Sequence, residues 1–325
     1  MRIIAQLKTL TLAVIFTTSL ALNVQAQTKN DVAIAFNAAV QLANTDIPGA
    51  IKAMTDVIGM CDKVGADAND LKANAQKAIP AWHYQIANNF LKDKKFDEAQ
   101  VSLEKSLELA ELYNDADTKD KVSKQLSKVY VVKGNSLLKA GKVDEALVLF
   151  DKSIVLQPTY AKAYFGKGQA CNKKANFDKM KEAMDLAIKN GKETGDTLSV
   201  NNAKNMMRDN MVTRAFKAVQ KGAHDQAINL ANSALTYDDK SKDAYYYLAV
   251  AYNNTSKWDN AIEASNKGLT LEANTKEKKA RFNFELGNAQ KGKGDTSAAC
   301  VYFKNAAYGI NAKAATDQIA KLNCK

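Results

Sequence analysis

A period of 34 residues, seen in the shifts from Tyr130 to Tyr164 and from Met211 to Tyr245, constrains the fold of this chain more than any other feature. With this shift two pairs of segments can be superimposed, and the matching positions are mostly apolar or small. In the first pair, Tyr130, Gly134, Ala146 and Phe150 match Tyr164, Gly168, Met180 and Met184. In the second pair, Met211, Ala215, Ala227 and Ala231 match Tyr245, Ala249, Ala261 and Ser265. Self-similarity at such a period is typical of repeat proteins, in which each unit buries its apolar face against the next. The sequence therefore predicts a stack of repeated units.

The composition predicts that each repeated unit is helical. The chain has only 3 Pro and 15 Gly among 325 residues, which is few turn-forming residues for an all-β fold. Gly141 and Gly222 fall between the paired segments of a unit, where a first helix must stop before a second begins. The unit is therefore expected to be a helical hairpin.

Two helices in 34 residues resemble the tetratricopeptide repeat (TPR), whose pattern is an aromatic residue, Leu-Gly, Tyr, Ala, Phe, Ala and Pro. The segment 127–160 matches this pattern best, through Tyr130, Gly134, Leu137, Ala146, Phe150, Ser153 and Pro158. The resemblance implies an all-α, right-handed α-solenoid of about seven TPR-like helical hairpins with a C-terminal capping helix. The hairpins are expected near residues 31–64, 80–113, 127–160, 161–194, 208–241, 242–275 and 280–310, and the cap over 311–325.

The spacing of the repeats is irregular at two places. The units that begin near Pro80 and Ser127 are 47 residues apart, as are those that begin near Ala161 and Arg208. The additional residues, which include 115–121 and 193–204, have a helical rather than a loop-like composition. Longer helices are therefore expected at these two positions.

The first 26 residues have the organisation of a secretory signal peptide. Arg2 and Lys8 flank an apolar run from Leu10 to Leu22, and small residues precede a cleavage site predicted after Ala26. The run is short for a membrane span, which needs about 20 apolar residues, and no Cys follows it closely for a lipid anchor. The junction resembles those of exported Gram-negative proteins, so a periplasmic or secreted protein with a solenoid over 27–325 is predicted. A buried or membrane-anchoring N-terminal helix is the alternative.

The positive charge of the chain does not indicate a nucleic-acid partner. The formal net charge is +11, but only Arg2, Arg208, Arg214 and Arg281 supply the guanidinium groups on which phosphate and base recognition depend. The lysines are spread along the chain and interleaved with Asp and Glu. We interpret them as solvated helix faces, and we expect neither nucleic-acid binding nor a membrane span.

The four cysteines indicate a possible disulfide rather than a metal site. None lies in a Cys-x-x-Cys pair, and the chain has only 2 His as further ligands. Cys61 and Cys171 fall within predicted helices and are expected to be small core residues. Cys300 lies in the last hairpin and Cys324 follows the cap, so in an oxidising compartment the two can form a disulfide. Two free thiols are the alternative.

No arrangement of residues indicates catalysis. The segment from Gly287 to Gly294 is similar to a phosphate-binding loop, but Gly294 stands where Ser or Thr should hold magnesium, and no strand precedes it. The carboxylates scatter over helix surfaces instead of pairing at a site. We therefore predict no enzymatic activity, no cofactor and no metal.

The resemblance to TPR proteins implies a ligand-binding concave groove lined by the first helix of each hairpin. Carrying the family's groove positions over gives four aromatic residues, Tyr84, Phe165, Tyr246 and Phe284, and one turn further along four amides, Asn88, Asn135, Gln169 and Asn288. A fifth amide, Asn253, is displaced by about another turn. Amides both donate to and accept from a peptide backbone, and aromatic rings anchor apolar side chains. The Lys of the family's carboxylate clamp is absent from the aromatic position. The alternative is that these are packing and surface residues.

The function predicted from these features is a non-enzymatic protein- or peptide-binding scaffold or adaptor in the cell envelope. Two alternatives stay open. The solenoid is a structural subunit of an envelope complex, held through its convex face or edges, or it binds glycan or peptidoglycan. The sequence does not identify the partner.

Overall fold

The computed structural model describes residues 28–325, so the predicted signal peptide, residues 1–26, lies outside the described part. All regular structure in that part is helical, with fifteen α-helices and two short 3₁₀ helices. The α-helices follow one another as seven hairpins and a final helix, which confirms the predicted fold class. By their contacts the described residues divide into an N-terminal unit, which ends at Val129, and a C-terminal unit, Tyr130–Lys325. The boundary lies within helix α5.

The N-terminal unit contains two hairpins and the first part of α5. Its elements are α1 (Lys29–Leu42), α2 (Ile47–Val64), η1 (Ala66–Ala68), α3 (Asn69–Lys92), α4 (Phe96–Leu112) and α5 (Ala116–Lys139) as far as Val129. Helix α1 begins at a capping box, in which Asp31 N–H donates to Thr28 Oγ1 over 3.3 Å and Thr28 N–H donates to Asp31 Oδ2 over 2.9 Å. Helix α3 continues through the buried Pro80, whose carbonyl accepts from Ser106 Oγ of α4 over 2.7 Å.

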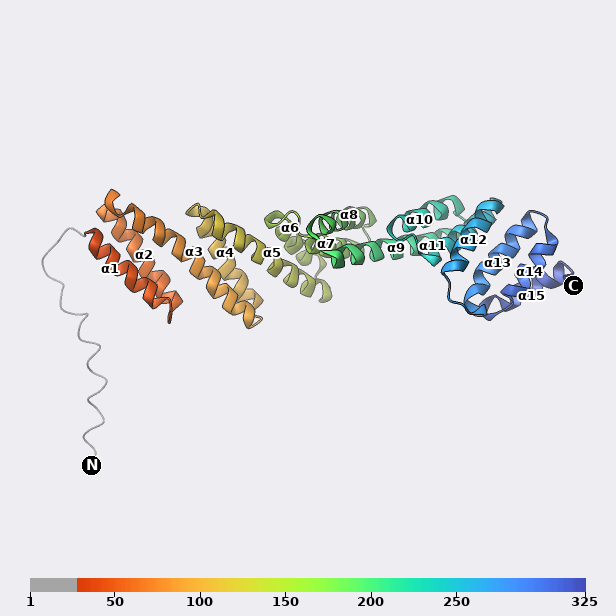
Figure 1. Ribbon diagram of the computed structural model, residues 1–325, viewed down its shortest axis with the longest axis horizontal. Coiled ribbons are helices and arrows are strands. Elements are labelled where there is room, and N and C mark those ends of the chain that lie inside the picture. Colours follow the sequence, from red (N-terminus) through yellow and green to blue (C-terminus); the bar gives the residue numbers. More distant parts are fainter. Residues whose placement is uncertain (1–27) are drawn as a thin grey trace, which may run out of the picture. The chain divides into compact units, whose positions relative to one another are not determined.

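The C-terminal unit continues the same arrangement from Tyr130. Its elements after α5 are α6 (Val143–Leu156), α7 (Ala161–Lys173), α8 (Phe177–Thr194), α9 (Thr197–Gln220), α10 (His224–Tyr237), α11 (Lys242–Asn254), α12 (Trp258–Leu271), α13 (Lys276–Gly292), α14 (Thr296–Ala306), η2 (Gly309–Asn311) and α15 (Ala312–Lys321). Each hairpin packs against the next, as Figure 1 shows for the helices in chain order. The first helices also contact one another directly, α7 with α9, α9 with α11 and α11 with α13. We call these helices, together with α5 from Tyr130, the first-helix layer.

The repeat positions recur because an aromatic ring fills the space that a small residue leaves at a helix crossing. Phe150 of α6 is fully buried, and a Cβ on Gly134 of α5 would lie 2.8 Å from its Cε1 atom. Phe303 of α14 stands in the same relation to Gly287 of α13, where a Cβ would lie 2.6 Å from the ring. A side chain at either glycine would therefore displace the core ring.

The longer helices expected at the irregular spacings are present. Helices α5 and α9 each have 24 residues. Gly195 adopts a left-handed backbone that ends α8, and Asp196 then caps α9 by accepting from Ser199 N–H over 3.1 Å. The additional turns of α9, residues 197–207, are held by the buried side chains of Val200, Ala203 and Met207.

The chain end is tied to the last hairpin. Cys300 of α14 and Cys324, which follows α15, form a disulfide with a Cα–Cα distance of 5.5 Å. Ala315 of α15 is fully buried, so this helix covers the last hairpin as a cap. The other two cysteines, Cys61 and Cys171, are free and buried.

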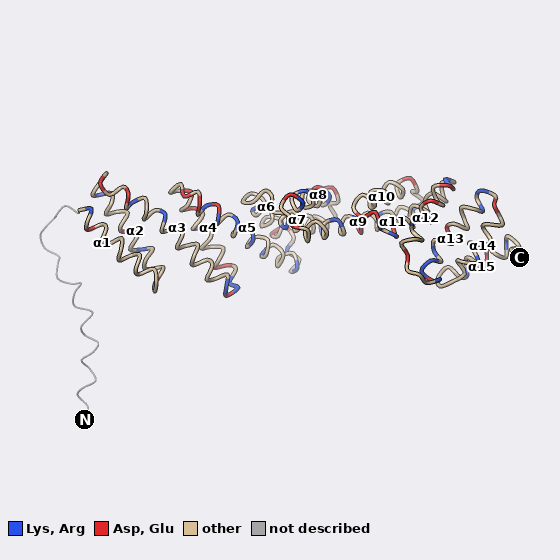
Figure 2. Tube along the Cα trace, viewed as in Figure 1, with Lys and Arg blue, Asp and Glu red and all other residues tan. Residues whose placement is uncertain are grey.

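Charged residues of both signs are interleaved along each unit (Figure 2). In the part of the chain that the structure describes, no helix is both long and apolar enough for a membrane crossing. Within the same residues no group of His, Cys, Asp and Glu is arranged to hold a metal ion.

Candidate functional site

A cavity of about 420 Å³ lies in the C-terminal unit between the first-helix residues of α5, α7 and α9. Four residues of α5, four of α7 and three of α9 line it: Val131, Asn135, Leu138, Lys139, Lys162, Phe165, Gln169, Lys173, Leu198, Ser199 and Asn202. Pockets that bind small ligands usually have volumes of roughly 300 to 1,000 Å³. We call this cavity and its rim the lysine groove.

Three of the predicted groove residues come together here. Asn135 and Gln169 occupy equivalent repeat positions, each directly after the glycine at a helix crossing, Gly134 and Gly168. Phe165 lies one turn before Gln169 on α7, and all three side chains are half-buried. The repeat period therefore brings an aromatic ring and two amides to one cavity.

The additional turns of α9 provide the third wall of the groove. Leu198, Ser199 and Asn202 all belong to these turns, and Leu198 is 63% exposed although it is apolar. Ser199 also donates its hydroxyl to Asp196 Oδ2 over 2.7 Å, which fixes the start of the helix. Repeat-based reasoning missed these residues because the TPR frame contains no counterpart of the additional turns.

The groove is cationic. Lys139, Lys162 and Lys173 line it, and no carboxylate does. Lys139 and Lys173 are separated by the 34-residue period, so a search for repeated cations would have found them in the sequence. Partial burial alone would raise the pKa of Asp196, but hydrogen bonds from Ser199 and the charge of Lys162 lower it. Asp196 therefore stays ionised beside one end of the groove.

The predicted residues of α11 and α13 are occupied within the protein. Asn253 donates from Nδ2 to the Glu285 backbone carbonyl over 3.0 Å and to Glu285 Oε2 over 2.7 Å, and Asn288 donates to the same Oε2 over 3.3 Å. Burial raises the pKa of Glu285, and these two hydrogen bonds offset that effect only in part. The rings of Phe284 and the core residue Phe303 pack at an interplanar angle of 62°, with centroids 5.6 Å apart. The amides here stabilise a buried carboxyl group.

Tyr246 belongs to an aromatic cluster that spans α9, α11 and α13. Successive ring centroids lie 5.7 Å apart from Phe216 to Tyr247, 5.3 Å from Tyr247 to Tyr246 and 5.9 Å from Tyr246 to Phe282. Burial raises the pKa of Tyr246 to about 12. Phe216 was not predicted as a groove residue, although it directly follows Ala215 and so occupies the repeat position of Asn135.

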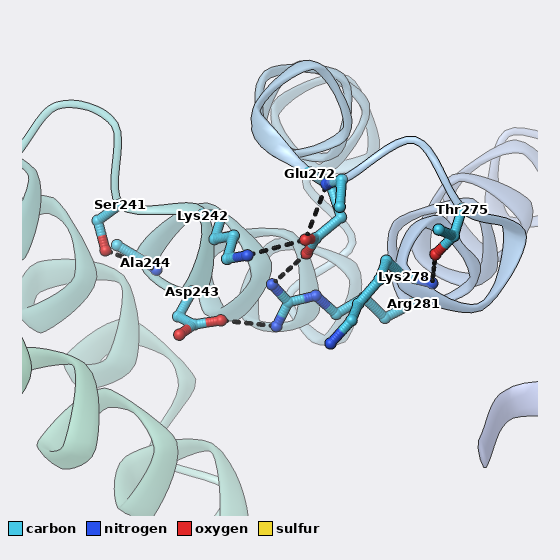
Figure 3. A network of polar contacts seen from close by, with 9 residues as sticks. Ser241, Lys242, Asp243, Ala244, Glu272, Thr275, Lys278 and Arg281 are labelled. Carbon is cyan, nitrogen blue, oxygen red and sulfur yellow. Dashed lines mark hydrogen bonds and ion pairs between the residues drawn. The ribbon is translucent and has the colours of Figure 1, made fainter. Parts of the chain in front are cut away.

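A charged network orients the arginine beside this cluster. The guanidinium group of Arg281 lies 5.1 Å from the ring centroid of Tyr246 and donates to Asp243 Oδ1 over 2.6 Å and to Glu272 Oε2 over 2.8 Å (Figure 3). Glu272 also accepts from Lys242 Nζ over 2.8 Å, and its side chain is only 2% exposed. Lys242 and Glu272 repeat the pairing of Arg208 with Asp238 one period earlier. The network therefore joins neighbouring hairpins instead of presenting free charges.

The remaining predicted residues lie in the N-terminal unit. Tyr84 and Asn88 are one turn apart on α3, and both are half-buried. Neither the His nor the Cys side chains of the chain line the lysine groove. The groove therefore offers amide, ammonium, hydroxyl and apolar groups, which suit binding through hydrogen bonds and ion pairs.

Two segments, residues 131–188 and 217–274, match the family model of the tetratricopeptide repeat. No curated protein matches the chain. Among solved structures it is similar to YrrB, described as a TPR protein with an unusual peptide-binding site, with 18% identity over 58% of this chain and 91% of that chain and a TM-score of 0.35. A tetratricopeptide repeat protein from Parabacteroides merdae matches with 14% identity over 90% of this chain and 99% of that chain (TM-score 0.30). The TPR2AB domain of yeast Sti1, described as a complex with pHSP90, matches with 14% identity over 76% of this chain and 97% of that chain (TM-score 0.32).

Proposed function

Because residues 131–188 and 217–274 are tetratricopeptide repeats, we propose that this protein is a non-enzymatic scaffold that binds a protein partner through an extended peptide segment in the lysine groove. TPR proteins are protein- and peptide-binding scaffolds as a class. The observation that carries the proposal is the convergence of Asn135, Phe165 and Gln169 on one cavity of about 420 Å³. All three occupy positions that the resemblance to TPR proteins assigns to a ligand-binding groove.

The chemistry of the lining suits a peptide. The side-chain amides of Asn135, Gln169 and Asn202 can each donate to a peptide carbonyl and accept from a peptide N–H. Phe165 and Leu198 offer apolar surface to one side chain of the ligand. Since no His or Cys lines the groove, it lacks the usual partners for a nucleophile, and we assign it no catalytic step.

The proposal places the protein in the cell envelope. Two observations support this location: the signal-peptide pattern of residues 1–26 and the disulfide between Cys300 and Cys324, which is typical of oxidising compartments. The intact mass of protein isolated from the envelope tests it. A mass that begins at Gln27 is the expected result, and a mass that retains residues 1–26 contradicts export.

A displayed library of random peptides tests the binding function directly. The mature chain is used to select peptides, and their affinity is then measured for a variant with Asn135→Ala, Phe165→Ala and Gln169→Ala. The matched control carries Asn229→Ala, Asn232→Ala and Asn266→Ala at exposed amides of α10 and α12. We expect the groove variant to lose binding and the control to keep it, with equal helicity of all three proteins by circular dichroism.

Two outcomes contradict the proposal. If no peptide is selected, the groove is not a peptide-binding surface. If selected peptides bind the groove variant as well as the original chain, the functional surface lies elsewhere, as the structural-subunit alternative requires.

A further inference from the structure

We propose that the lysine groove is selective for an acidic peptide segment, in which carboxylates flank one apolar side chain. The inference rests on the proposed peptide-binding function and adds the chemistry of the ligand. It is carried by the contrast between the lysines that line the groove and three neighbouring lysines of the same two hairpins.

Neighbouring lysines that face away from the groove are paired with carboxylates. Lys167 of α7 lies 2.8 Å from Asp151 of α6, and Lys174, directly after α7, lies 2.5 Å from Asp144 of α6. Lys142, directly before α6, lies 3.3 Å from Glu145. These three cations therefore already have carboxylate partners within the protein.

The three groove lysines differ from these neighbours. Within the described residues, 28–325, no ion pair is found for Lys139, Lys162 or Lys173. All eleven lining residues are neutral or cationic, so three positive charges converge on one cavity, and the nearby carboxylate of Asp196 lies outside the lining beside one end. A cleft lined by charge of one sign with low-dielectric walls concentrates the field and attracts the opposite charge.

The shape of the lining determines where an apolar group would bind. Val131 and Leu138 of α5 are buried, whereas Leu198 of α9 is 63% exposed across the same cavity. An exposed leucine beside a half-buried Phe165 is apolar surface that a ligand side chain can cover. The lysines on α5 and α7 would then meet carboxylates on either side of that side chain.

Several features distinguish this groove from a nucleic-acid site. No arginine lines it, and one ring, Phe165, is the sole aromatic group in the lining. Single-stranded nucleic acids are usually held by several stacking rings along a basic path. A peptide carboxylate needs only a point charge, which lysine supplies.

Synthetic peptides test the inference by fluorescence polarisation with the full mature chain. The probe has two acidic residues on each side of a leucine, and its matched partners replace every Asp and Glu by Asn and Gln, or the leucine by serine. We expect the uncharged peptide to bind about tenfold or more weakly than the acidic probe, and added salt to weaken the acidic probe alone. Amidated and free C-termini distinguish side-chain carboxylates from a terminal carboxylate as the source of charge.

Charge-matched variants identify the lysines responsible. Lys139→Gln, Lys162→Gln and Lys173→Gln together are expected to abolish the preference for the acidic probe. The control removes the same charge through Lys189→Gln, Lys217→Gln and Lys221→Gln, at exposed positions outside the groove lining, and is expected to keep the preference. These lysines are all exposed, so folding is expected to be unchanged, which circular dichroism checks.

The outcomes separate this inference from the function on which it rests. Library peptides that bind the groove but carry no excess of Asp and Glu overturn the acidic preference and leave peptide binding intact. An equal loss in the control variant assigns the effect to net charge and overturns the role of the groove. Displacement of the acidic probe by an oligothymidine strand at equal concentration would overturn the inference and indicate a nucleic acid as the ligand of the groove.

Discussion

The groove region (α5 to α9) and the C-terminal hairpins (α11 to α14) have amide side chains at the same repeat position, but in opposite environments. Asn135, Gln169 and Asn288 each follow the glycine at a helix crossing. The first two line a cavity, whereas Asn288 donates to Glu285 inside the protein. A repeat position therefore determines which face a side chain occupies, and its neighbours determine whether it is available to a ligand.

The difference follows from the spacing of the hairpins. Equivalent positions on α11 and α13, such as Tyr246 and Phe284, are 38 residues apart, which is close to the regular period of 34. Between α7 and α9 the spacing rises to 47 residues, from Tyr164 to Met211, and the additional turns of α9 line the groove. An insertion in the helix thus adds a wall that the regular repeat does not have.

The largest expected effect tests whether the two regions share one kind of core. Phe150→Ala and Phe303→Ala each remove a fully buried ring and should lower the free energy of unfolding by about 3–5 kcal/mol. Urea unfolding followed by circular dichroism measures both. If one of them costs less than about 1 kcal/mol, the two regions are not built on equivalent crossings.

Reduction of the disulfide should destabilise the C-terminal hairpins and leave the groove unchanged. The bond between Cys300 and Cys324 closes a segment with a sequence separation of 24, and opening it should cost about 3 kcal/mol because the unfolded chain gains freedom. A thermal melt with and without reductant measures the loss, and a Cys300→Ser, Cys324→Ser variant should no longer respond to reductant. Weaker peptide binding in that variant would show that the regions are coupled.

The amide side chains of the two regions should contribute differently to the free energy of unfolding. Asn253→Ala removes two hydrogen bonds to the buried Glu285 and should cost about 1–3 kcal/mol, because the carboxyl group loses its strongest donor. Gln169→Ala, at the groove, should change the free energy of unfolding by less than about 0.5 kcal/mol. Equal costs in denaturant unfolding would contradict the contrast between occupied and available amides.

The pH dependence of stability should carry a contribution from Glu285. Its pKa in the folded protein lies above the ordinary value of 4.5, chiefly because of burial, so the folded state binds the proton more tightly than the unfolded state. The stability that this group contributes is present below pH 4.5 and is lost as the pH rises through the folded pKa. Glu285→Gln should therefore gain stability relative to the original chain as the pH rises.

The original chain is the control for the pH dependence of the Glu285→Gln variant, because the other carboxyl groups are the same in both proteins. Asp238 and Glu272 have lowered pKa values in both, because hydrogen bonds from Arg208 and from Lys242 and Arg281 outweigh the opposing effect of burial. Their contributions have the opposite sign and cancel in the difference between variant and original. A difference that is flat from pH 4 to pH 8, roughly the range in which carboxyl groups with raised pKa values titrate, would show that the pKa of Glu285 is not raised.

Much of the fold was predictable because it depends on local and periodic features. Tyr130, Gly134 and Phe150 recur with a period that only stacked hairpins satisfy, and the insertions were recognisable as longer helices from their composition. The disulfide partners were also recognisable from their position, although their distance was not. By contrast, the sequence did not indicate that α3 extends upstream of Pro80 to Asn69, since a buried proline within a helix is held there by packing.

The sequence by itself determined the repeat and the helical hairpins, since both depend on spacing along one chain, and its resemblance to TPR proteins indicated Asn135, Phe165 and Gln169 as groove residues. Only the tertiary structure decided which amides are free, because Asn253 of α11 meets the buried Glu285 of α13 across two helices that no local pattern relates, and the same carboxylate accepts from Asn288 within α13. It also decided that Leu198 and Asn202 complete the groove. Availability to a ligand depends on what lies across a cavity, and that is settled by packing between helices.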